Sequence, residues 1–357
     1  MSSQELIHSI IQRIATGPDL SKDIDFEEAR LGMEAILKGE VDDVRSAIFL
    51  IALRMKRETM DENKGILAAI QNLTTNQKVN VENLIDIGDP YSGYNRSIPV
   101  SSFLPPLLAE LGLPSLIHGL NSVSPKFGLT HRHVSELMGC DVNMSSSSAK
   151  GRIENTQIGW AYLDQSQYCP GLHDLVELRD RVIKRTVLNT VETLIGPLRG
   201  NKTHSILGYV HKPYPPIYAD LVNASGMDTA LLIRGVEGGV IPSLRQKGLM
   251  ISYTGIEEED RVDIDPSELG IKQEMRAIAF PEKMSVEKNI TELAKYTFDL
   301  GIDALSGKEG MFFDGLLLGA SLILWHTKKV NSLSEASEKV RETLKSGTTL
   351  SRLKKIV

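Results

Sequence analysis

Cysteine is scarce in this sequence, with only Cys140 and Cys169 among 357 residues. Two cysteines are too few for a disulfide framework or for a zinc site built from cysteine ligands. Free cysteines without a pairing pattern are typical of proteins that work in a reducing compartment. We therefore expect a cytoplasmic protein without structural disulfides.

Aromatic residues and positive charge are also in short supply. Phe, Trp and Tyr make up 5% of the chain, which argues against an aromatic platform for stacking nucleic-acid bases across the molecule. The formal net charge of −6 gives no overall attraction to nucleic acid or to an anionic membrane. A local basic face remains compatible with this composition.

The sequence lacks a hydrophobic run long enough to cross a bilayer. The most apolar stretch, Met311 to Trp325, is shorter than a membrane span and contains Asp314. The first residues, MSSQELIHSIIQRIATG, have no basic start followed by an apolar run, so they predict an amphipathic helix rather than a signal peptide. We expect a soluble protein that does not bind membranes.

What is present is an ordinary globular composition, with 41% apolar and 24% charged residues. A chain of this length can form one large domain or two unequal ones. Apolar residues at helical spacing fill FEEARLGMEAILKG, VDDVRSAIFLIALRMKRE and TMDENKGILAAIQNLT, and Asp42 or Asp43 is suited to cap the second helix. Residues 1–80 therefore predict a helical bundle domain.

From residue 81 the pattern changes to short apolar runs that alternate with helical segments. The runs NLIDIG, PSLIHG, HSILGYV, TALLIRG and LMISYT predict a mostly parallel central sheet flanked by helices. Residues 170–196 predict helices that pack back on the bundle, and EEED at 257–260 predicts an exposed acidic loop. The expected fold class is α/β, with a helical domain (1–80) and a larger α/β domain (81–357).

Several segments, in this order, resemble one enzyme family. DFEEARLGMEAILKGEVDDVRSAIFLIALRMKRET resembles the N-terminal helices of the anthranilate phosphoribosyltransferases, which belong to glycosyltransferase family 3. IHGLNSVSPKFG resembles their His-Gly loop, RTVLNTVETLIGPL their Arg-Thr segment, and SLSEASEKVRETLKSGTTLSRLKKIV their closing helices. The resemblance covers nearly the whole chain, and it indicates a divergent member.

The resemblance implies a cleft between the helical and α/β domains, and a homodimer formed through the helical domain. Enzymes of this family transfer phosphoribose from phosphoribosyl pyrophosphate to an acceptor nitrogen, with magnesium on the pyrophosphate. The related pyrimidine nucleoside phosphorylases share the fold and use inorganic phosphate. The expected partner is therefore a phosphorylated small molecule such as phosphoribosyl pyrophosphate, or phosphate itself.

The loop that matches the family's glycine-rich pyrophosphate loop is altered. It runs from Gly88 to Gly93 as GDPYSG, where the family has Gly-Thr-Gly-Gly-Asp-Gly. Glycines let backbone N–H groups approach a phosphate, whereas Pro90 removes a donor and Asp89 adds negative charge. Two interpretations stay open: a weakened anion site, or an ordinary turn from a strand into a helix.

The helix start that follows is altered in the same way. PVSS stands where the family has Asn-Ile-Ser-Thr, and Ser101 or Ser102 is suited to cap a helix. Pro105 and Pro106 then remove two N–H donors from its first turn, which makes a poorer cradle for an anion.

The His-Gly loop keeps part of the family pattern. Leu120 replaces the Asn that reaches the acceptor, and Asn121 replaces the following Arg. Lys126 matches and is the best candidate for meeting a phosphate, because an ammonium binds an anion as a point charge. The alternative is a solvated loop lysine. The residues expected to bind phosphate or sugar are Gly88, Ser92, Gly93, Ser101, Ser102, Ser122 and Lys126.

The family holds magnesium with an acidic pair that this sequence lacks, so we expect no metal site. Val240 and Ile241 occupy the positions of the family's adjacent Asp-Glu pair, and aliphatic side chains offer no oxygen ligand to Mg²⁺. His131 and His133 would lie on different faces of a helix, which favours surface or capping roles over metal binding. No cofactor is therefore expected. The loop expected over the cleft contains Glu237, Gly238 and Gly239.

On the acceptor side, Arg179 matches the family's arginine that meets the acceptor carboxylate, a role that suits a bidentate guanidinium. Arg181, Lys184 and Arg185 lie at helical spacing and form either a basic ridge or a solvated face paired with carboxylates. Because Leu120 replaces the family's Asn, we do not expect an efficient anthranilate enzyme. The residues expected on the acceptor side are His118, Gly119, Asn121 and Arg179.

Two functions stay open. The first is a pentosyl or phosphoribosyl transferase, or a phosphorylase, with an altered acceptor and no assigned catalytic residue. The second is a non-catalytic relative that binds a phosphate ligand or nucleic acid, since divergent members with degraded loops have been linked to nucleic acid. Residues 328–357 hold eight Lys or Arg against three Glu, which form either a phosphate-binding strip or a solvated helix face.

Overall fold

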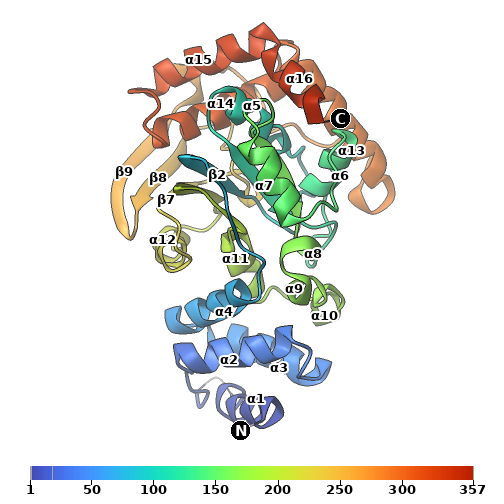
Figure 1. Cartoon of the computed structure of the whole chain (residues 1–357), viewed down its shortest axis with the longest axis vertical. Helices are drawn as coiled ribbons and strands as arrows, with labels where there is room; N and C mark the ends of the chain where they lie inside the picture. Colours follow the sequence, from blue (N-terminus) through green and yellow to red (C-terminus); the bar gives the residue numbers. More distant parts are fainter. Residues whose placement is uncertain (1, 18, 357) are drawn as a thin grey trace.

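The structure, a computed structural model, describes residues 2–17 and 19–356. Figure 1 shows the N-terminal helices packed together at one end of the molecule. They are α1 (Ser3–Ile14), α2 (Phe26–Leu37), α3 (Asp43–Lys56) and α4 (Met60–Asn72). The predicted helical bundle is confirmed.

Side-chain caps explain where these helices begin. Ser2, Asp25 and Thr59 each accept a hydrogen bond from the backbone N–H three residues later, and the Glu at that position bonds back to the cap. Of the two candidates for α3, Asp42 is the cap. Local sequence therefore starts each helix, and the apolar stripes then bring the helices together.

A seven-stranded sheet forms the centre of the larger part, in the order β4-β3-β2-β6-β7-β8-β9. Strands β4, β3, β2, β6 and β7 are parallel, and β8 and β9 extend one edge in antiparallel fashion. The mostly parallel central sheet is thus confirmed. The strands are β2 (Asn83–Gly88), β3 (Ser115–Gly119), β4 (Trp160–Asp164), β6 (Lys202–Gly208), β7 (Thr229–Ile233), β8 (Gly248–Thr254) and β9 (Glu257–Ile264).

Two strands of this sheet were not expected from the sequence. β4 is short and fully buried, and its run WAYLD does not stand out from the neighbouring helical segments. The prediction of an acidic loop at 257–260 was wrong, because this segment is part of the edge strand β9. Most β9 side chains are exposed, so the strand has no apolar alternation, and its charge discourages pairing with another sheet edge.

Helices cover both faces of the sheet, and the C-terminal helices close the end opposite the bundle (Figure 1). Within residues 2–17 and 19–356, no helix combines the length and the hydropathy that a membrane span requires. The remaining helices are η1 (Val100–Phe103), α5 (Leu104–Glu110), α6 (His131–Leu137), α7 (Ser146–Glu154), α8 (Gln165–Tyr168), α12 (Tyr214–Ala224), η3 (Val236–Gly238), η4 (Pro266–Leu269), α13 (Val286–Leu305), α14 (Met311–His326), α15 (Leu333–Ser346), α16 (Thr348–Leu353) and η5 (Lys354–Ile356).

The segment 170–196 consists of four short helices rather than long ones. They are α9 (Pro170–His173), α10 (Val176–Val182), α11 (Leu188–Val191) and η2 (Glu192–Leu194). Ile183 adopts a left-handed conformation with φ of 66° and ends α10. α10 contacts α3 and α11 contacts α4, while β1 (Gln77–Lys78) pairs with β5 (Leu198–Arg199) beside them. The domain boundary at residue 80 stays a prediction.

Alternating strand positions supply two separate hydrophobic cores. On β2, Leu84 belongs to the core shared with the bundle, whereas Ile85 and Ile87 belong to the core beneath the C-terminal helices. On β6, Leu207 belongs to the core shared with the bundle and Ile206 to the core beneath the C-terminal helices. Strands that are buried on both faces have continuous apolar sequences. The apolar runs therefore predicted these strands although apolar and polar residues do not alternate in them.

Candidate functional site

The carboxyl ends of three strands meet the helical bundle at a cavity of about 230 Å³. Gly88 ends β2, Gly208 ends β6, and Gly238 follows β7, and all three line the cavity together with Arg54 of α3. In open α/β sheets, ligands bind outside the carboxyl ends of the strands, where the chain connections diverge. The cavity is therefore the candidate functional site.

Part of the predicted phosphate site lies at this cavity. Gly88, Ser92 and Lys126 line it, and Glu237 and Gly238 of the predicted cleft loop join them. The structure thus brings together residues from three separate segments of the chain.

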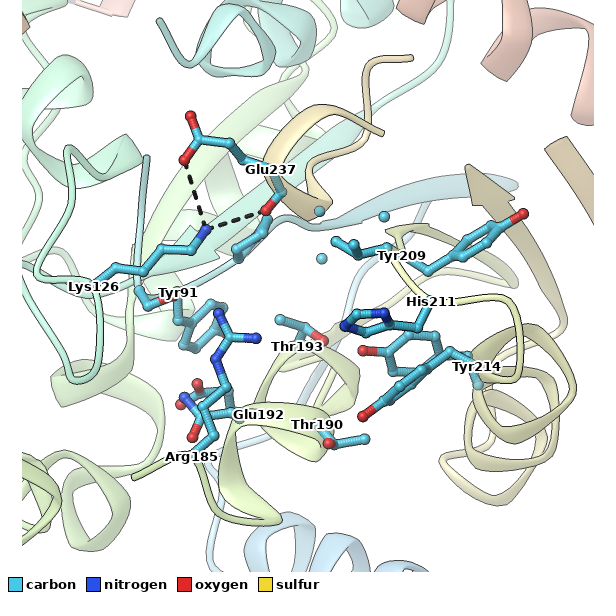
Figure 2. A pocket seen from close by; sticks show the side chains of 18 of the residues that line it. Tyr91, Lys126, Arg185, Thr190, Glu192, Thr193, Tyr209, His211, Tyr214 and Glu237 are labelled. Atoms are coloured by element: carbon cyan, nitrogen blue, oxygen red, sulfur yellow. Dashed lines mark hydrogen bonds and ion pairs between the residues drawn. The ribbon is translucent and has the colours of Figure 1, made fainter. Parts of the chain in front are cut away.

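Lys126 is held at the cavity wall by two backbone carbonyls. Its ammonium donates to the carbonyl oxygens of Gly93 and Glu237, each at 3.1 Å. It also lies 4.0 Å from the Glu237 carboxylate, and Figure 2 marks both contacts with Glu237. Burial lowers the pKa of Lys126, the Glu237 charge opposes this, and the nearby Arg185 lowers the pKa further. An anion in the cavity would stabilise the charged form of this lysine.

Glu237 fastens the loop over the cleft to the turn beneath it. Its carboxylate accepts from the backbone N–H groups of Asn95 (3.1 Å) and Arg96 (3.0 Å) and from the hydroxyl of Ser97 (2.8 Å). Gly239 is packed so tightly that an added Cβ would lie 1.8 Å from the Tyr94 hydroxyl oxygen. The loop is therefore bonded shut along this side of the cavity.

Ser101 and Ser102, predicted to bind phosphate, are not brought to the cavity. Both are buried at the start of η1, and their hydroxyls bond to the side chains of Asp89 and His131 respectively. Ser122 is half-buried in the loop after β3 and is not among the lining residues. The distribution of hydroxyl groups therefore differs from that expected for a pyrophosphate site.

The predicted acceptor residues are mostly committed to other contacts. His118 lies in the buried strand β3, with Nε2 2.9 Å from Asp86 Oδ1 and Nδ1 bonded to the Tyr91 hydroxyl. Arg179 is buried in a bidentate ion pair with Glu192, at 2.7 and 2.9 Å. The predicted acceptor residues His118, Gly119, Asn121 and Arg179 do not line the cavity. Only their partners Tyr91 and Glu192 do.

His131 and His133 take different roles from one another. His133 takes the predicted capping role, since its Nδ1 accepts from the backbone N–H of Thr130 at 3.3 Å at the start of α6. A surface or capping role was wrong for His131, which is buried with Nε2 2.7 Å from Asp89 Oδ2. Spacing along a helix separates the two rings, but it does not reveal that one of them faces a buried carboxylate.

Much of the cavity wall was missed from the sequence. Figure 2 shows Arg185 near Lys126 on one side, and His211 and Tyr214 on the other. Tyr209 and Tyr218 also line the aromatic side. The sequence indicates Arg185 only as part of a possible basic ridge. Tyr209 and His211 directly follow β6, so their position at the end of a parallel strand was the available signal, whereas Tyr214 and Tyr218 belong to the next helix, α12.

The donor set does not fit a magnesium ion held by the protein. Val240 is buried, its side chain has no ligand atom, and Ile241 is aliphatic as well. The Glu237 oxygens are already taken by the 95–97 segment. Within residues 2–17 and 19–356, no group of three or more His, Cys, Asp or Glu side chains is arranged to hold a metal.

Several basic residues near the C-terminus are neutralised by ion pairs. Arg352 pairs with Glu110, and Lys345 pairs with Glu309 at 2.7 Å. These contacts remove positive charge from the strip at 328–357, which is the candidate surface for nucleic acid.

Comparison with known proteins gives matches along most of the chain. The pattern described as glycosyl transferase family, helical bundle domain, matches residues 8–73, and that described as glycosyl transferase family, a/b domain, matches residues 92–350. An anthranilate phosphoribosyltransferase of Petrotoga mobilis is 27% identical over 352 residues, which cover 97% of this chain and 95% of the relative. An uncharacterized protein of Aquifex aeolicus is 26% identical over 339 residues, covering 95% and 99% respectively.

Solved structures share the whole fold at lower identity. The anthranilate phosphoribosyltransferase of Thermus thermophilus has a TM-score of 0.74 at 20% identity, covering 99% of this chain and 98% of its own. The Saccharomyces cerevisiae enzyme in complex with PRPP and Mg has a TM-score of 0.76 at 16% identity, covering 99% and 97%. At these identities the likeness establishes the fold.

Proposed function

This chain belongs to the glycosyl transferase family of the anthranilate phosphoribosyltransferases, and from that premise we propose that its cavity binds a phosphorylated pentose and transfers the pentosyl group. The observation that carries the proposal is the pair of cations, Lys126 and Arg185, at the cavity beside the carboxyl end of β2. The yeast relative with PRPP and Mg supports a phosphorylated ligand for the same fold.

The local charge of the cavity favours an anion. Arg185 is exposed at the cavity and has no ion pair within the described part of the chain, whereas the neighbouring Arg181 pairs with Asp43. Glu192 also lines the cavity, but its charge is already matched by Arg179. The cavity therefore presents more positive than negative charge, which attracts phosphate.

The altered pyrophosphate loop belongs to this proposal. Pro90 and Tyr91 line the cavity where the family's glycines would offer N–H groups, and Val240 stands where the family has an acidic ligand. Departure or entry of plain phosphate concentrates less charge than departure of pyrophosphate, so two cations suffice without a carboxylate-held metal. Positioning of the sugar against the acceptor would supply the rest of the acceleration.

Anthranilate is not the proposed acceptor. Leu120, at the position of the family's Asn, is buried and carries no polar group. The aromatic side of the cavity instead offers Tyr209, His211 and Tyr214, which suit a flat acceptor of different polarity. A homodimer and a cytoplasmic location are parts of the same proposal. The exposed apolar side chains of Val44, Met55 and Ile183 support the first, and the scarcity of cysteine supports the second.

A non-catalytic role in binding phosphate ligands or nucleic acid is the second candidate. The altered loop favours it, since a site that has lost N–H donors still holds an anion through Lys126 and Arg185. Binding of oligonucleotides with a steep dependence on salt, together with no turnover of any pentose phosphate, would favour this candidate over the transferase.

The test is a thermal-shift screen with ribose 1-phosphate, whose C1–O bond to phosphate would break in the transfer, and with phosphoribosyl pyrophosphate, phosphate, nucleosides and short oligonucleotides. A ligand of the folded protein raises the melting temperature as its concentration exceeds Kd. We expect Lys126→Ala and Arg185→Ala each to weaken binding of ribose 1-phosphate by about 1–3 kcal/mol, the range for a lost charged contact. Lys184→Ala is the matched control, because Lys184 is exposed and does not line the cavity.

Unchanged affinity in both cavity variants would remove these residues from the site. Turnover of phosphoribosyl pyrophosphate and anthranilate with Mg²⁺ at an ordinary enzymatic rate would show that the proposed change of acceptor is wrong.

A further inference from the structure

Asp89 is a fully buried carboxylate at the edge of the cavity. It lies between Gly88 and Pro90, which both line the cavity, yet Asp89 itself does not line it and is 0% exposed. An unpaired buried carboxylate would be strongly destabilising. The side chain must therefore be matched by partners inside the protein.

Four hydrogen-bond donors surround this carboxylate. Oδ2 accepts from the hydroxyls of Tyr94 at 2.9 Å and Ser101 at 2.5 Å, and lies 2.7 Å from Nε2 of His131. Oδ1 accepts from the backbone N–H of Val240 at 2.9 Å. The donors come from four places in the sequence, so they form a receptor that only the folded chain assembles.

A further hydrogen bond fixes the orientation of His131 in the receptor. Ser102 lies 2.7 Å from Nδ1 of His131, which orients the imidazole toward Asp89. Burial acts to raise the pKa of Asp89, but the hydrogen bond and charge of His131, with the bonds from Ser101 and Tyr94, outweigh it and lower the pKa. The carboxylate is therefore an anion in the folded protein.

The receptor adjoins the cation at the cavity. The carbonyl of Glu237 accepts from Lys126, and Val240, three residues later in the same loop, donates to Asp89. A phosphate group at Lys126 would therefore lie next to a donor set that is already occupied by a carboxylate.

We infer that Asp89 is an internal anion that fills a preformed anion receptor beside the cavity, and that it thereby restricts the site to ligands with one phosphate group. The restriction rests on the proposed function, whereas the filled receptor does not. A diphosphate extending from Lys126 toward the 235–241 loop would find the donors Tyr94, Ser101 and Val240 already engaged by Asp89. Asp89 is thus a specificity-determining residue.

Chemical rescue tests the receptor. Removing the carboxylate with Asp89→Ala leaves four unsatisfied donors around a space that fits a small anion. We expect this variant to melt several degrees below wild type and to recover at least half of the loss in sodium formate, relative to sodium chloride of equal concentration. The wild-type protein should respond equally to the two salts, because its receptor is filled.

Asp89→Asn is the second variant and keeps the experiment decisive. The amide has the same shape without the charge, so we expect a lower melting temperature than wild type and no rescue by formate. If Asp89→Ala folds only when formate is present, the inference is supported. An Asp89→Asn protein as stable as wild type, or equal responses of Asp89→Ala to formate and chloride, would overturn it.

Pyrophosphate tests the restriction. In wild type we expect phosphate and pyrophosphate to bind with similar affinity, and in Asp89→Ala we expect pyrophosphate to gain at least tenfold over phosphate. No gain would overturn the restriction. Combining Asp89→Ala with Lys126→Ala separates the two proposals: formate rescue that persists while cavity binding is lost shows that the receptor stands independently of the proposed function.

Discussion

At the scale of single residues, two histidines are buried in a chain of neutral hydrogen bonds across the sheet. His204 contacts Asn83 at 2.9 Å and Thr229 at 2.8 Å, and Thr229 in turn lies 2.8 Å from Nε2 of His326. Ser252 completes the chain, 2.9 Å from Nδ1 of His326. Neither ring has a carboxylate partner at hydrogen-bond distance within the described residues, so the neutral forms are favoured.

Burial gives these histidines unusually low pKa values. It lowers the pKa of His204 to about 4, with Asp228 opposing and Lys202 adding to the effect. It lowers the pKa of His326 to about 3, to which the charges of His204 and Lys328 also contribute. Because unfolded histidine titrates near the ordinary value of 6.5, protonation favours the unfolded chain as the pH falls below that value.

We predict that the protein loses stability between pH 7 and pH 5 partly through these two rings. The contribution of His326 is fully present above its unfolded pKa and decreases as the pH falls toward the folded value. Integrating the linkage relation gives about 2 kcal/mol lost by pH 5 for this residue. The measurement is the free energy of unfolding in urea at pH 7 and pH 5.

His326→Gln is the comparison for this prediction. Glutamine can bond to Thr229 and Ser252 but does not titrate, so its unfolding free energy should decrease less over the same range. Parallel pH profiles for the two proteins would contradict a neutral buried histidine at this position.

At the scale of elements, close backbone contacts seat the 235–241 loop on the sheet. A Cβ on Gly208, at the end of β6, would lie 2.1 Å from the Gly238 carbonyl oxygen. A Cβ on Gly239 would lie 1.8 Å from the Tyr94 hydroxyl. The loop can therefore bring Val240 to Asp89 only if both positions lack a side chain.

We predict that Gly239→Ala destabilises the protein by about 1–3 kcal/mol, since the added methyl forces the loop away from Tyr94. Gly151 provides a control on another element: it lies in α7 with open space around it. Gly151→Ala should stabilise by about 0.5–1 kcal/mol, because alanine favours helix. Chemical denaturation measures the unfolding free energy of both variants. If Gly239→Ala and Gly151→Ala changed it equally, the close contact between the loop and Tyr94 would not contribute to stability.

At the scale of the whole molecule, the helical bundle presents an exposed apolar face. Val44 and Met55 of α3 are 68% and 76% exposed, and Ile183 after α10 is 68% exposed. Ile48 lies between them on α3 and is also exposed. Exposed apolar side chains gathered on adjoining elements mark an interaction surface. We propose a second copy of this chain as its partner.

We predict that the protein sediments as a homodimer and that Val44→Glu combined with Ile183→Glu yields a folded monomer. A charge placed in an apolar interface would be buried without a partner, which opposes association. Analytical ultracentrifugation measures the mass, and circular dichroism confirms that the variant is folded. Glu substitution at exposed Ile256, on the distant β8–β9 turn, is the control and should leave the dimer intact. A wild-type monomer at micromolar concentration would show that this face has another role.

Most of the order of helices and strands, β4 and β9 excepted, could be predicted from sequence because it depends on local chemistry. Capping residues such as Asp25 and Thr59 start helices through contacts three residues away. Buried parallel strands require continuous apolar runs, and those runs stand out in β2 and β6. The sequence also singled out Gly88 and Lys126, which line the cavity, because they belong to segments that resemble a known family in the right order; their role in binding phosphate stays a prediction.

The side chains that face one another were decided only by the tertiary structure. Ser101, His131 and Val240 lie 12 or more residues from Asp89, and nothing in their spacing shows that they join Tyr94 as donors around one carboxylate. Arg179 matched a family position, yet its guanidinium is bonded to a buried glutamate. Hydrogen bonds between distant segments depend on how the sheet and helices pack, whereas sequence patterns report only the periodicity and termini of each element.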